Sequence, residues 1–154
     1  IHPRELQDNA TPSGNALAAM ALLWLAAYEG NHEWQTTSEN TLGTLQEMLQ
    51  RHPTAFAFWL QVFNFAIEPV QQIALTWPAD NPDYPAYLNE IWRTYRPHAL
   101  VAGSAWPAPP FAPSLLKDRP PQGHSVTVYI CQDFVCNQPS TTLADLREQL
   151  ETLA

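Results

Sequence analysis

Lysine is nearly absent from this sequence, and its scarcity limits the partners that the chain can bind. The 154 residues include a single lysine, Lys117, and the formal net charge is -8. Nucleic acids and anionic membrane surfaces both require a basic footprint on the protein that binds them. We therefore expect no nucleic-acid partner and no membrane partner for this chain.

Apolar segments long enough to cross a membrane are also lacking. The stretch from Ala16 to Tyr28 carries no polar side chain except the Tyr28 hydroxyl, yet it is shorter than the ~20 apolar residues that span a bilayer. A helix that is apolar on every side is predicted to be buried on every side. The sequence also starts at Ile1, without an initiator methionine or a signal-like leader, so we expect a processed chain or a piece of a longer one.

Cysteine is scarce too, which bears on redox compartment and on metal binding. The two cysteines, Cys131 and Cys136, are fewer than a disulfide-stabilised secreted domain usually carries, and this favours a reduced, cytoplasmic protein. Their C-x4-C spacing differs from the C-x-x-C of thioredoxin-like redox sites. We expect two reduced packing thiols. The alternative is a disulfide, which is sterically possible if the chain reverses between the two cysteines. No metal is predicted, because His98 and His124 lack a recognisable zinc spacing, and no cofactor is predicted either.

The first part of the chain predicts three helices. Thr11 and Ser13 are both suitable N-caps for a helix that ends before Gly30, a natural C′ residue. A second helix starts near Asn31, and a third spans residues 53–68. Three helices that are apolar on most faces cannot cover one another. We therefore expect further helices or a partner chain to cover the faces that stay exposed.

The second part of the chain predicts strands alternating with helices. The predicted strands are residues 72–77, 99–103 and 125–131, and the predicted helices follow Asp83 and span residues 142–153. This order suggests a small parallel sheet with covering helices. The sequence thus divides into a helical part, residues 1–69, and an α/β part, residues 70–154.

Two stretches carry a family resemblance, DNATPSGNALAAMALLWLAAYEG at residues 8–30 and LLKDRPPQGHSVTVYICQDFVCNQP at residues 115–139. Together with the order of elements between them, they resemble the C-terminal end of the spermatogenesis-associated protein 20 family. The resemblance implies a longer protein in which a thioredoxin-like domain precedes an (α/α)6 toroid, similar to six-hairpin glycosidases and N-acylglucosamine 2-epimerases. Residues 1–69 would then be the last helices of the toroid, and residues 70–154 a C-terminal α/β appendage with a short parallel sheet.

Small polar residues gather at the start of the first predicted helix, namely Asp8, Thr11, Ser13 and Asn15. In a toroid, helix starts line one mouth of the central cavity, and a helix N-terminus suits an anion or sugar hydroxyls. We therefore consider these four residues a candidate substrate-binding site. The alternative is capping, which explains Thr11 and Ser13 completely. Catalytic residues stay unassigned, because a glycosidase needs two placed carboxylates and Asp8 is the only acid at this motif.

Two functions follow from the resemblance as expectations. The first is part of a carbohydrate-handling enzyme, hydrolase-like or epimerase-like when complete, with a small sugar as ligand. The second is a non-catalytic scaffold, or a redox pair of Cys131 and Cys136 that serves the upstream thioredoxin-like domain. In both, the principal partner is the remainder of the chain's own polypeptide. A third and plainer expectation is an interaction module without chemistry.

Overall fold

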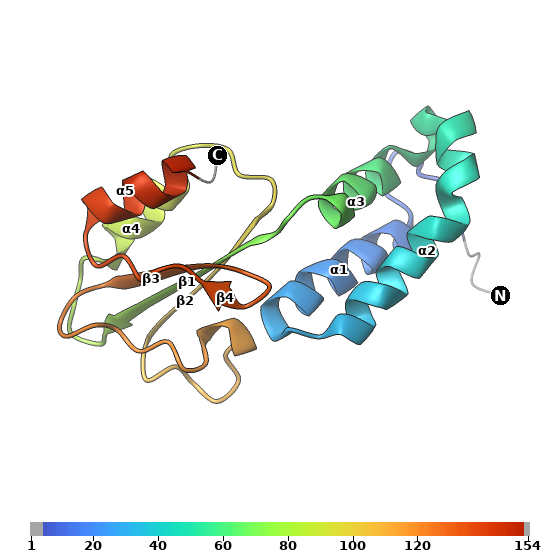
Figure 1. Ribbon diagram of the computed structural model, residues 1–154. Helices are drawn as coiled ribbons and strands as arrows, with labels where there is room; N and C mark the ends of the chain where they lie inside the picture. Colours follow the sequence, from blue (N-terminus) through green and yellow to red (C-terminus); the bar gives the residue numbers. More distant parts are fainter. Residues whose placement is uncertain (1–4, 153–154) are drawn as a thin grey trace. The chain divides into compact units, whose positions relative to one another are not determined.

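The computed structural model describes residues 5–152, which form two compact units that divide between Pro69 and Val70 (Figure 1). The described part of the first unit is helical, and that of the second holds a four-stranded sheet with two α-helices. Among residues 5–152, no helix is both long enough and apolar enough to cross a membrane. The assignment of the helical unit to a toroid stays a prediction.

The first helix, α1 (Gly14–Glu29), starts and ends where its sequence predicts. Ser13 is the N-cap, and its hydroxyl accepts a hydrogen bond from the Ala16 N–H at 3.2 Å. Gly30 has a φ of 70°, the left-handed conformation that ends many helices and that glycine adopts without a steric penalty. Of the two predicted caps, Ser13 is therefore confirmed, and Thr11 lies in the loop before the helix.

Two further helices complete the described part of this unit. The second helix, α2 (His32–Arg51), is capped by Asn31, whose side-chain oxygen accepts hydrogen bonds from two N–H groups of the first turn. A 3-10 turn, η1 (Pro53–Phe56), leads into α3 (Ala57–Ile67). The predicted starts of both helices, near Asn31 and at residue 53, are confirmed.

Polar groups within the helical core are paired. Ser38 of α2 is fully buried, and its hydroxyl donates a hydrogen bond to the Ala19 carbonyl of α1 at 3.0 Å. Trp59 of α3 is also fully buried, and its indole N–H donates to the Leu6 carbonyl at 2.8 Å. An unpaired polar group at such positions would destabilise the fold, so these bonds fix how the helices and the incoming loop pack.

The apolar side chains of α1 are not all buried within this chain. Leu17 is 49% exposed, Trp24 45% and Leu25 48%, and their spacing places them on one face of the helix. We call these three residues the α1 stripe. The prediction that this helix is buried on every side is therefore wrong for the described chain. Helix α3 leaves Leu60 and Ile67 exposed as well, so the three helices do not cover one another's apolar faces.

The sheet of the second unit is mixed rather than parallel. Its strands are β1 (Gln71–Pro78), β2 (Ala99–Trp106), β3 (Thr127–Gln132) and β4 (Val135–Cys136), in the spatial order β2-β1-β3-β4. Strands β1 and β2 pair in parallel, whereas β3 pairs antiparallel with both β1 and β4. The prediction of a parallel sheet is therefore correct for the first pair of strands and wrong for β3, and β4 was not predicted.

The connections between strands explain this topology. Helix α4 (Tyr84–Ile91) joins β1 to β2 and carries the chain back along the sheet, as parallel pairing requires. The connection from β2 to β3 is proline-rich and contains only a short 3-10 turn, η2 (Ser114–Leu116). No longer helix returns the chain to the end of the sheet where β1 begins. Strand β3 therefore begins beside the end of β1, where Thr127 pairs with Thr76, and runs antiparallel to β1.

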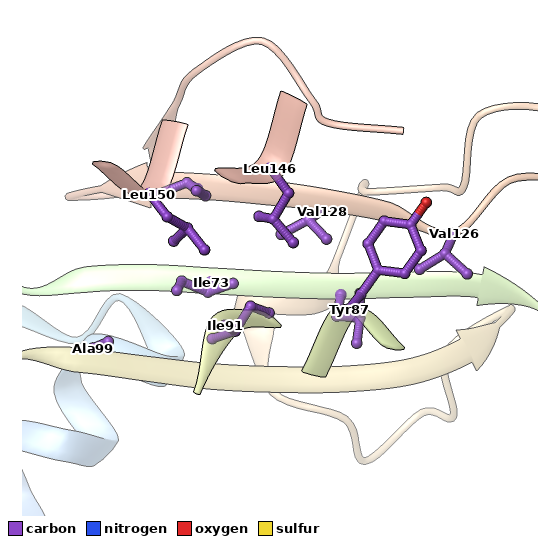
Figure 2. Packing of buried hydrophobic residues seen from close by; sticks show 10 residues of the cluster. Ile73, Tyr87, Ile91, Ala99, Val126, Val128, Leu146 and Leu150 are labelled. Carbon is purple, nitrogen blue, oxygen red and sulfur yellow. The ribbon is translucent and has the colours of Figure 1, made fainter. Parts of the chain in front are cut away.

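The main core of this unit lies between one face of the sheet and the two helices α4 and α5 (Leu143–Thr152), as Figure 2 shows. Ile73 and Val128 of the sheet are fully buried against Ile91 and Leu146 of the helices. Side chains alternate between the two faces of a strand, so Gln72 and Cys131 belong to the other face. That face is the one covered by η2, whose two leucines are buried.

An ion-pair cluster around Glu90 links α4 to α5. One carboxylate oxygen of Glu90 lies 2.7 Å from Nε of Arg93, and the other lies 2.9 Å from Nη2 of Arg147. Burial alone would raise the pKa of Glu90, but hydrogen bonds from Arg147 and Arg93 outweigh it and lower this pKa below its ordinary value. The cluster therefore stabilises the packing of these helices most when Glu90 is ionised.

Candidate functional site

The predicted substrate-binding residues lie where the incoming loop meets the starts of α1 and α3. Asp8 is partly buried, and its two carboxylate oxygens serve two different helices. Oδ1 accepts a hydrogen bond from the Ser13 N–H at 2.8 Å, and Oδ2 accepts one from the Phe58 N–H at 2.8 Å. A carboxylate is favoured here because helix N-termini present free N–H groups and the positive end of the dipole. Asp8 therefore ties the two helix starts together.

The other three candidates are also used within the protein. The Ser13 hydroxyl caps α1, and the side-chain amide of Asn15 donates to the Glu5 carbonyl at 3.0 Å. Thr11 is exposed, and its carbonyl accepts a hydrogen bond from the Asn9 N–H at 3.0 Å. The structure thus brings Asp8, Ser13 and Asn15 together as supports of the loop and its helix. Contact of these residues with a sugar stays a prediction.

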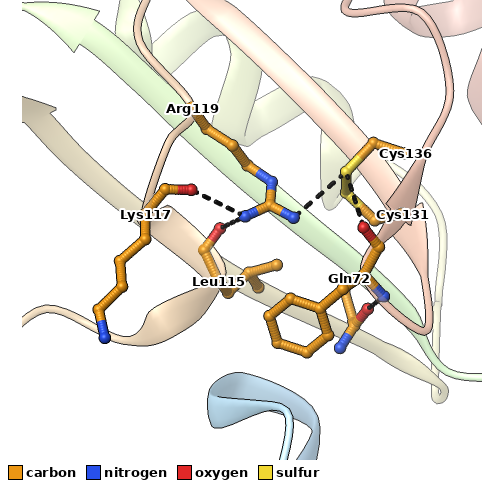
Figure 3. Close-up of a disulfide and its surroundings, with 7 residues drawn as sticks. Gln72, Leu115, Lys117, Arg119, Cys131 and Cys136 are labelled. Atoms are coloured by element: carbon orange, nitrogen blue, oxygen red, sulfur yellow. Dashed lines mark hydrogen bonds between the residues drawn. A yellow bond between two sulfur atoms is a disulfide. The ribbon is translucent and has the colours of Figure 1, made fainter.

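The two cysteines form a disulfide, with a sulfur–sulfur distance of 2.07 Å (Figure 3). Cys131 of β3 lies directly opposite Cys136 of β4 in an antiparallel pair. The expectation of two reduced packing thiols is therefore wrong, and the open alternative of a disulfide is confirmed. The reason is the unpredicted strand β4, because only a chain reversal immediately after β3 brings the two thiols face to face.

The turn between β3 and β4 has an unusual backbone. Its two residues, Asp133 and Phe134, have φ values of 49° and 62°. Two positive φ values define the tight hairpin turn that asparagine and glycine normally form, and a bulky residue rarely adopts them. A hydrogen bond compensates, because the Phe134 N–H donates to the side-chain oxygen of Gln72 at 2.8 Å. Gln72 is only 3% exposed, so the buried amide of β1 holds this turn in place.

Arg119 reaches the disulfide from the segment after η2 (Figure 3). Its Nη2 lies 3.3 Å from the Cys136 sulfur, within hydrogen-bonding distance for a sulfur acceptor. Its Nη1 donates to the carbonyls of Leu115 at 2.8 Å and Lys117 at 3.1 Å. The guanidinium carbon also lies 5.7 Å from the ring centroid of Phe134, which suits a cation–π contact. One buried cation therefore contacts both the disulfide and its turn.

The charge of Arg119 is poorly compensated by its surroundings. The residue is only 9% exposed, and burial lowers the pKa of its guanidinium, which Tyr129 and Asp118 raise only in part. Within residues 5–152, Arg119 forms no ion pair, and its Nε has no hydrogen-bond partner. Burial also raises the pKa of Tyr129, so its hydroxyl stays neutral. That hydroxyl donates a hydrogen bond to the Pro120 carbonyl at 2.7 Å.

The two sulfur-bearing residues differ in accessibility. Cys131 is 3% exposed on the η2 side of the sheet, whereas Cys136 lies on the short edge strand and is partly exposed. Cys136 is therefore the more accessible residue of the pair. Sequence reasoning singled out both cysteines but missed Arg119 and Gln72. Arg119 lies within the stretch that carries the family resemblance, but no spacing rule connects it with the cysteines.

Comparison with known proteins finds relatives along nearly the whole chain. The chain is 28% identical to spermatogenesis-associated protein 20 of mouse, 27% to that of rat and 26% to that of human, each over 153 residues and 94% of the chain. The chain spans 19% of the length of each of these relatives. No protein-family model and no solved structure matches the chain. The resemblance to spermatogenesis-associated protein 20 is thus confirmed.

Proposed function

Because the chain is related to spermatogenesis-associated protein 20, we propose that it is the C-terminal part of a longer protein and takes part there in thiol–disulfide exchange. One observation carries this proposal. Cys136 is a partly exposed residue, and its sulfur lies 3.3 Å from a buried guanidinium that has no counter-ion among the described residues. Reactive cysteines lie in positively charged, partly accessible surroundings of this kind, whereas inert structural cysteines are buried in apolar ones.

The exchange begins with a thiolate of a donor dithiol. This thiolate attacks the Cys136 sulfur, the bond between Cys136 and Cys131 breaks, and Cys131 leaves as a thiolate that takes up a proton. The donor's second thiolate then attacks the donor sulfur of the mixed disulfide, which closes the donor disulfide and releases the Cys136 thiolate. Two electrons pass from the donor to the cysteine pair. We propose that the donor is the thioredoxin-like domain that the family resemblance implies.

The partner of the helical unit is part of the same proposal. We propose that further helices of the longer protein cover the α1 stripe and the exposed apolar residues of α3. Two facts support this, namely the exposure of Leu17, Trp24 and Leu25 by nearly half each, and the small share of its relatives that the chain spans. A toroid built from such helices, and any carbohydrate-related activity in its cavity, stay predictions from the resemblance. No contact among residues 5–152 favours the sugar-binding alternative, because both oxygens of Asp8 serve helix starts.

Trapping of the mixed disulfide tests the proposed exchange. Cys131→Ser removes the buried sulfur and leaves Cys136 to be activated as a mixed disulfide with 5-thio-2-nitrobenzoate. A reduced thioredoxin-type protein that lacks its second, resolving cysteine should then displace thionitrobenzoate and form a stable mixed disulfide with Cys136. Cys136→Ser is the matched control, and it should give little adduct because Cys131 is buried. Intact mass measured with and without reductant counts the adducts. Equal adduct in both variants, or none in either, would overturn the proposal.

A further inference from the structure

The disulfide site contains a buried positive charge that the oxidised state leaves unbalanced. The donors of Arg119 face two carbonyls, a sulfur and an aromatic ring, all of them neutral. Burial of an unpaired charge is costly, and native proteins usually place a counter-ion beside it. The nearby groups that titrate or carry charge are Asp118, Tyr129 and Lys117, and none of them forms an ion pair with Arg119 within residues 5–152.

Reduction of the disulfide would supply the missing anion. When the sulfur–sulfur bond breaks and the pair takes up two electrons, Cys136 can carry a negative charge at the atom that already lies 3.3 Å from Arg119. We propose that Arg119 is the residue that favours the reduced state of the Cys131–Cys136 pair, by acting as the counter-ion of the Cys136 thiolate. This inference rests on the thiol–disulfide exchange proposed above.

The backbone around the pair supports a functional rather than a purely structural disulfide. Among residues 5–152, the non-glycine residues with positive φ are Asp118, Asp133 and Phe134. Asp118 directly precedes Arg119, and the other two form the turn between the cysteines. Residues in sparsely populated conformations cluster at functional sites, because the surrounding contacts must hold them there. Here those contacts are the Gln72 side chain and the Arg119 guanidinium, which converge on the ring and backbone of Phe134.

The inference fixes the direction in which electrons flow. A disulfide whose reduced form is stabilised is a strong oxidant of other thiols, whereas a structural disulfide resists reduction. The cysteine pair would therefore accept electrons from a dithiol of lower potential, and the positive charge would also attract the attacking thiolate. The class of substrate is an accessible dithiol on a protein, attacking as its thiolate. The Cys136 thiolate released in the last step is the leaving group that Arg119 stabilises.

Equilibration with glutathione tests the effect on the reduced state. Arg119→Met removes the charge and keeps a side chain of similar length, and it should shift the equilibrium about tenfold toward the disulfide, which corresponds to about 30 mV for a two-electron couple. Arg119→Lys should recover part of this loss, because it restores the charge. Arg147→Met is the control, since Arg147 pairs with Glu90 away from the cysteines. An Arg119→Met equilibrium equal to that of the parent would overturn the inference.

A second measurement needs no change at Arg119 and so does not depend on the folding of that variant. In Cys131→Ser, the pH–rate profile for alkylation of Cys136 should have its midpoint at least about one pH unit below the value of about 8.5 that is ordinary for cysteine. A midpoint at or above the ordinary value would overturn the role of Arg119, even if mixed disulfides still form. Absence of mixed disulfides in the trapping experiment would instead overturn the exchange itself. The two failures are therefore distinguishable.

Discussion

Asp8 offers the sharpest test of how the helical unit is held together. Its carboxylate accepts one hydrogen bond at the start of α1 and one at the start of α3, each at 2.8 Å. Hydrogen bonds to charged groups contribute about 1.5–3 kcal/mol each. The lower end applies, because both bonds are only partly buried and water can replace the carboxylate after its removal. Asp8→Ala should therefore lower the free energy of unfolding by about 3 kcal/mol, the sum of two such bonds.

The loss should be shared between two helices that are distant in sequence. Urea unfolding followed by circular dichroism measures the total, and amide hydrogen exchange locates it at the first turns of α1 and α3. Asp8→Asn keeps one acceptor oxygen, so it should retain roughly half of the stabilisation. Asp80→Ala, at an exposed position of the second unit, is the control and should change little. Faster exchange at α1 alone, or a loss below about 0.5 kcal/mol, would refute the proposed bridge.

The same variant separates the structural role of Asp8 from the predicted sugar contact. If Asp8 only supports the helices, a sugar that stabilises the complete protein should stabilise Asp8→Asn by the same increment. If Asp8 binds the sugar, the increment should disappear in Asp8→Asn while the unliganded stability falls only in part. A thermal-shift panel of sugars, run on the complete protein and this variant, decides between the two outcomes.

Two further outcomes are expected. The pKa of Glu90 lies below its ordinary value, so its stabilising effect is fully present above the unfolded-state pKa and is lost as pH falls through the lowered folded-state pKa. The parent should therefore be more stable than Glu90→Gln by a constant amount between about pH 7 and 5, and this difference should shrink below about pH 4. Urea unfolding midpoints measure the difference, and a difference that does not depend on pH would contradict the prediction. Replacement of the α1 stripe by serine should reduce the binding of hydrophobic dye to the 154-residue chain and its aggregation. Phe111→Ser is the control, because Phe111 is 89% exposed in the other unit and its replacement should change neither property.

The elements with local signals were predicted well. Ser13 and Gly30 bracket α1 because one can cap the first turn and the other can adopt a positive φ, and both properties belong to single residues. The alternation around Ile130 likewise predicted β3, with small errors at its ends. Burial was harder to predict. Leu17 and Trp24 look like core residues in the sequence, but whether an apolar side chain is covered depends on what the rest of the protein places over it.

Sequence reasoning singled out individual residues of the candidate site but did not predict which distant residues they contact. Asp8 was singled out for its carboxylate, but its distant partner Phe58 is fixed by the packing of α3, which no local pattern encodes. Arg119 was missed for the same reason. Its contact with Cys136 joins the segment after η2 to an edge strand, and it exists only because both lie on the same side of the sheet. Sequence spacing carries information about neighbours along one element and little about such convergence.

The C-x4-C spacing shows why the disulfide itself was hard to foresee. Two cysteines five positions apart face each other across this hairpin because its turn has two residues, and a turn of three residues would change the register and the pairing. Such a turn needs two positive φ values, and Asp133 with Phe134 is a poor match to the usual asparagine–glycine pair. The turn forms because Gln72 and Arg119 hold Phe134 from the sheet and from the η2 side. The pairing of the cysteines is therefore a property of the tertiary structure, in which Arg119, one of the two residues that hold the turn, also contacts the Cys136 sulfur.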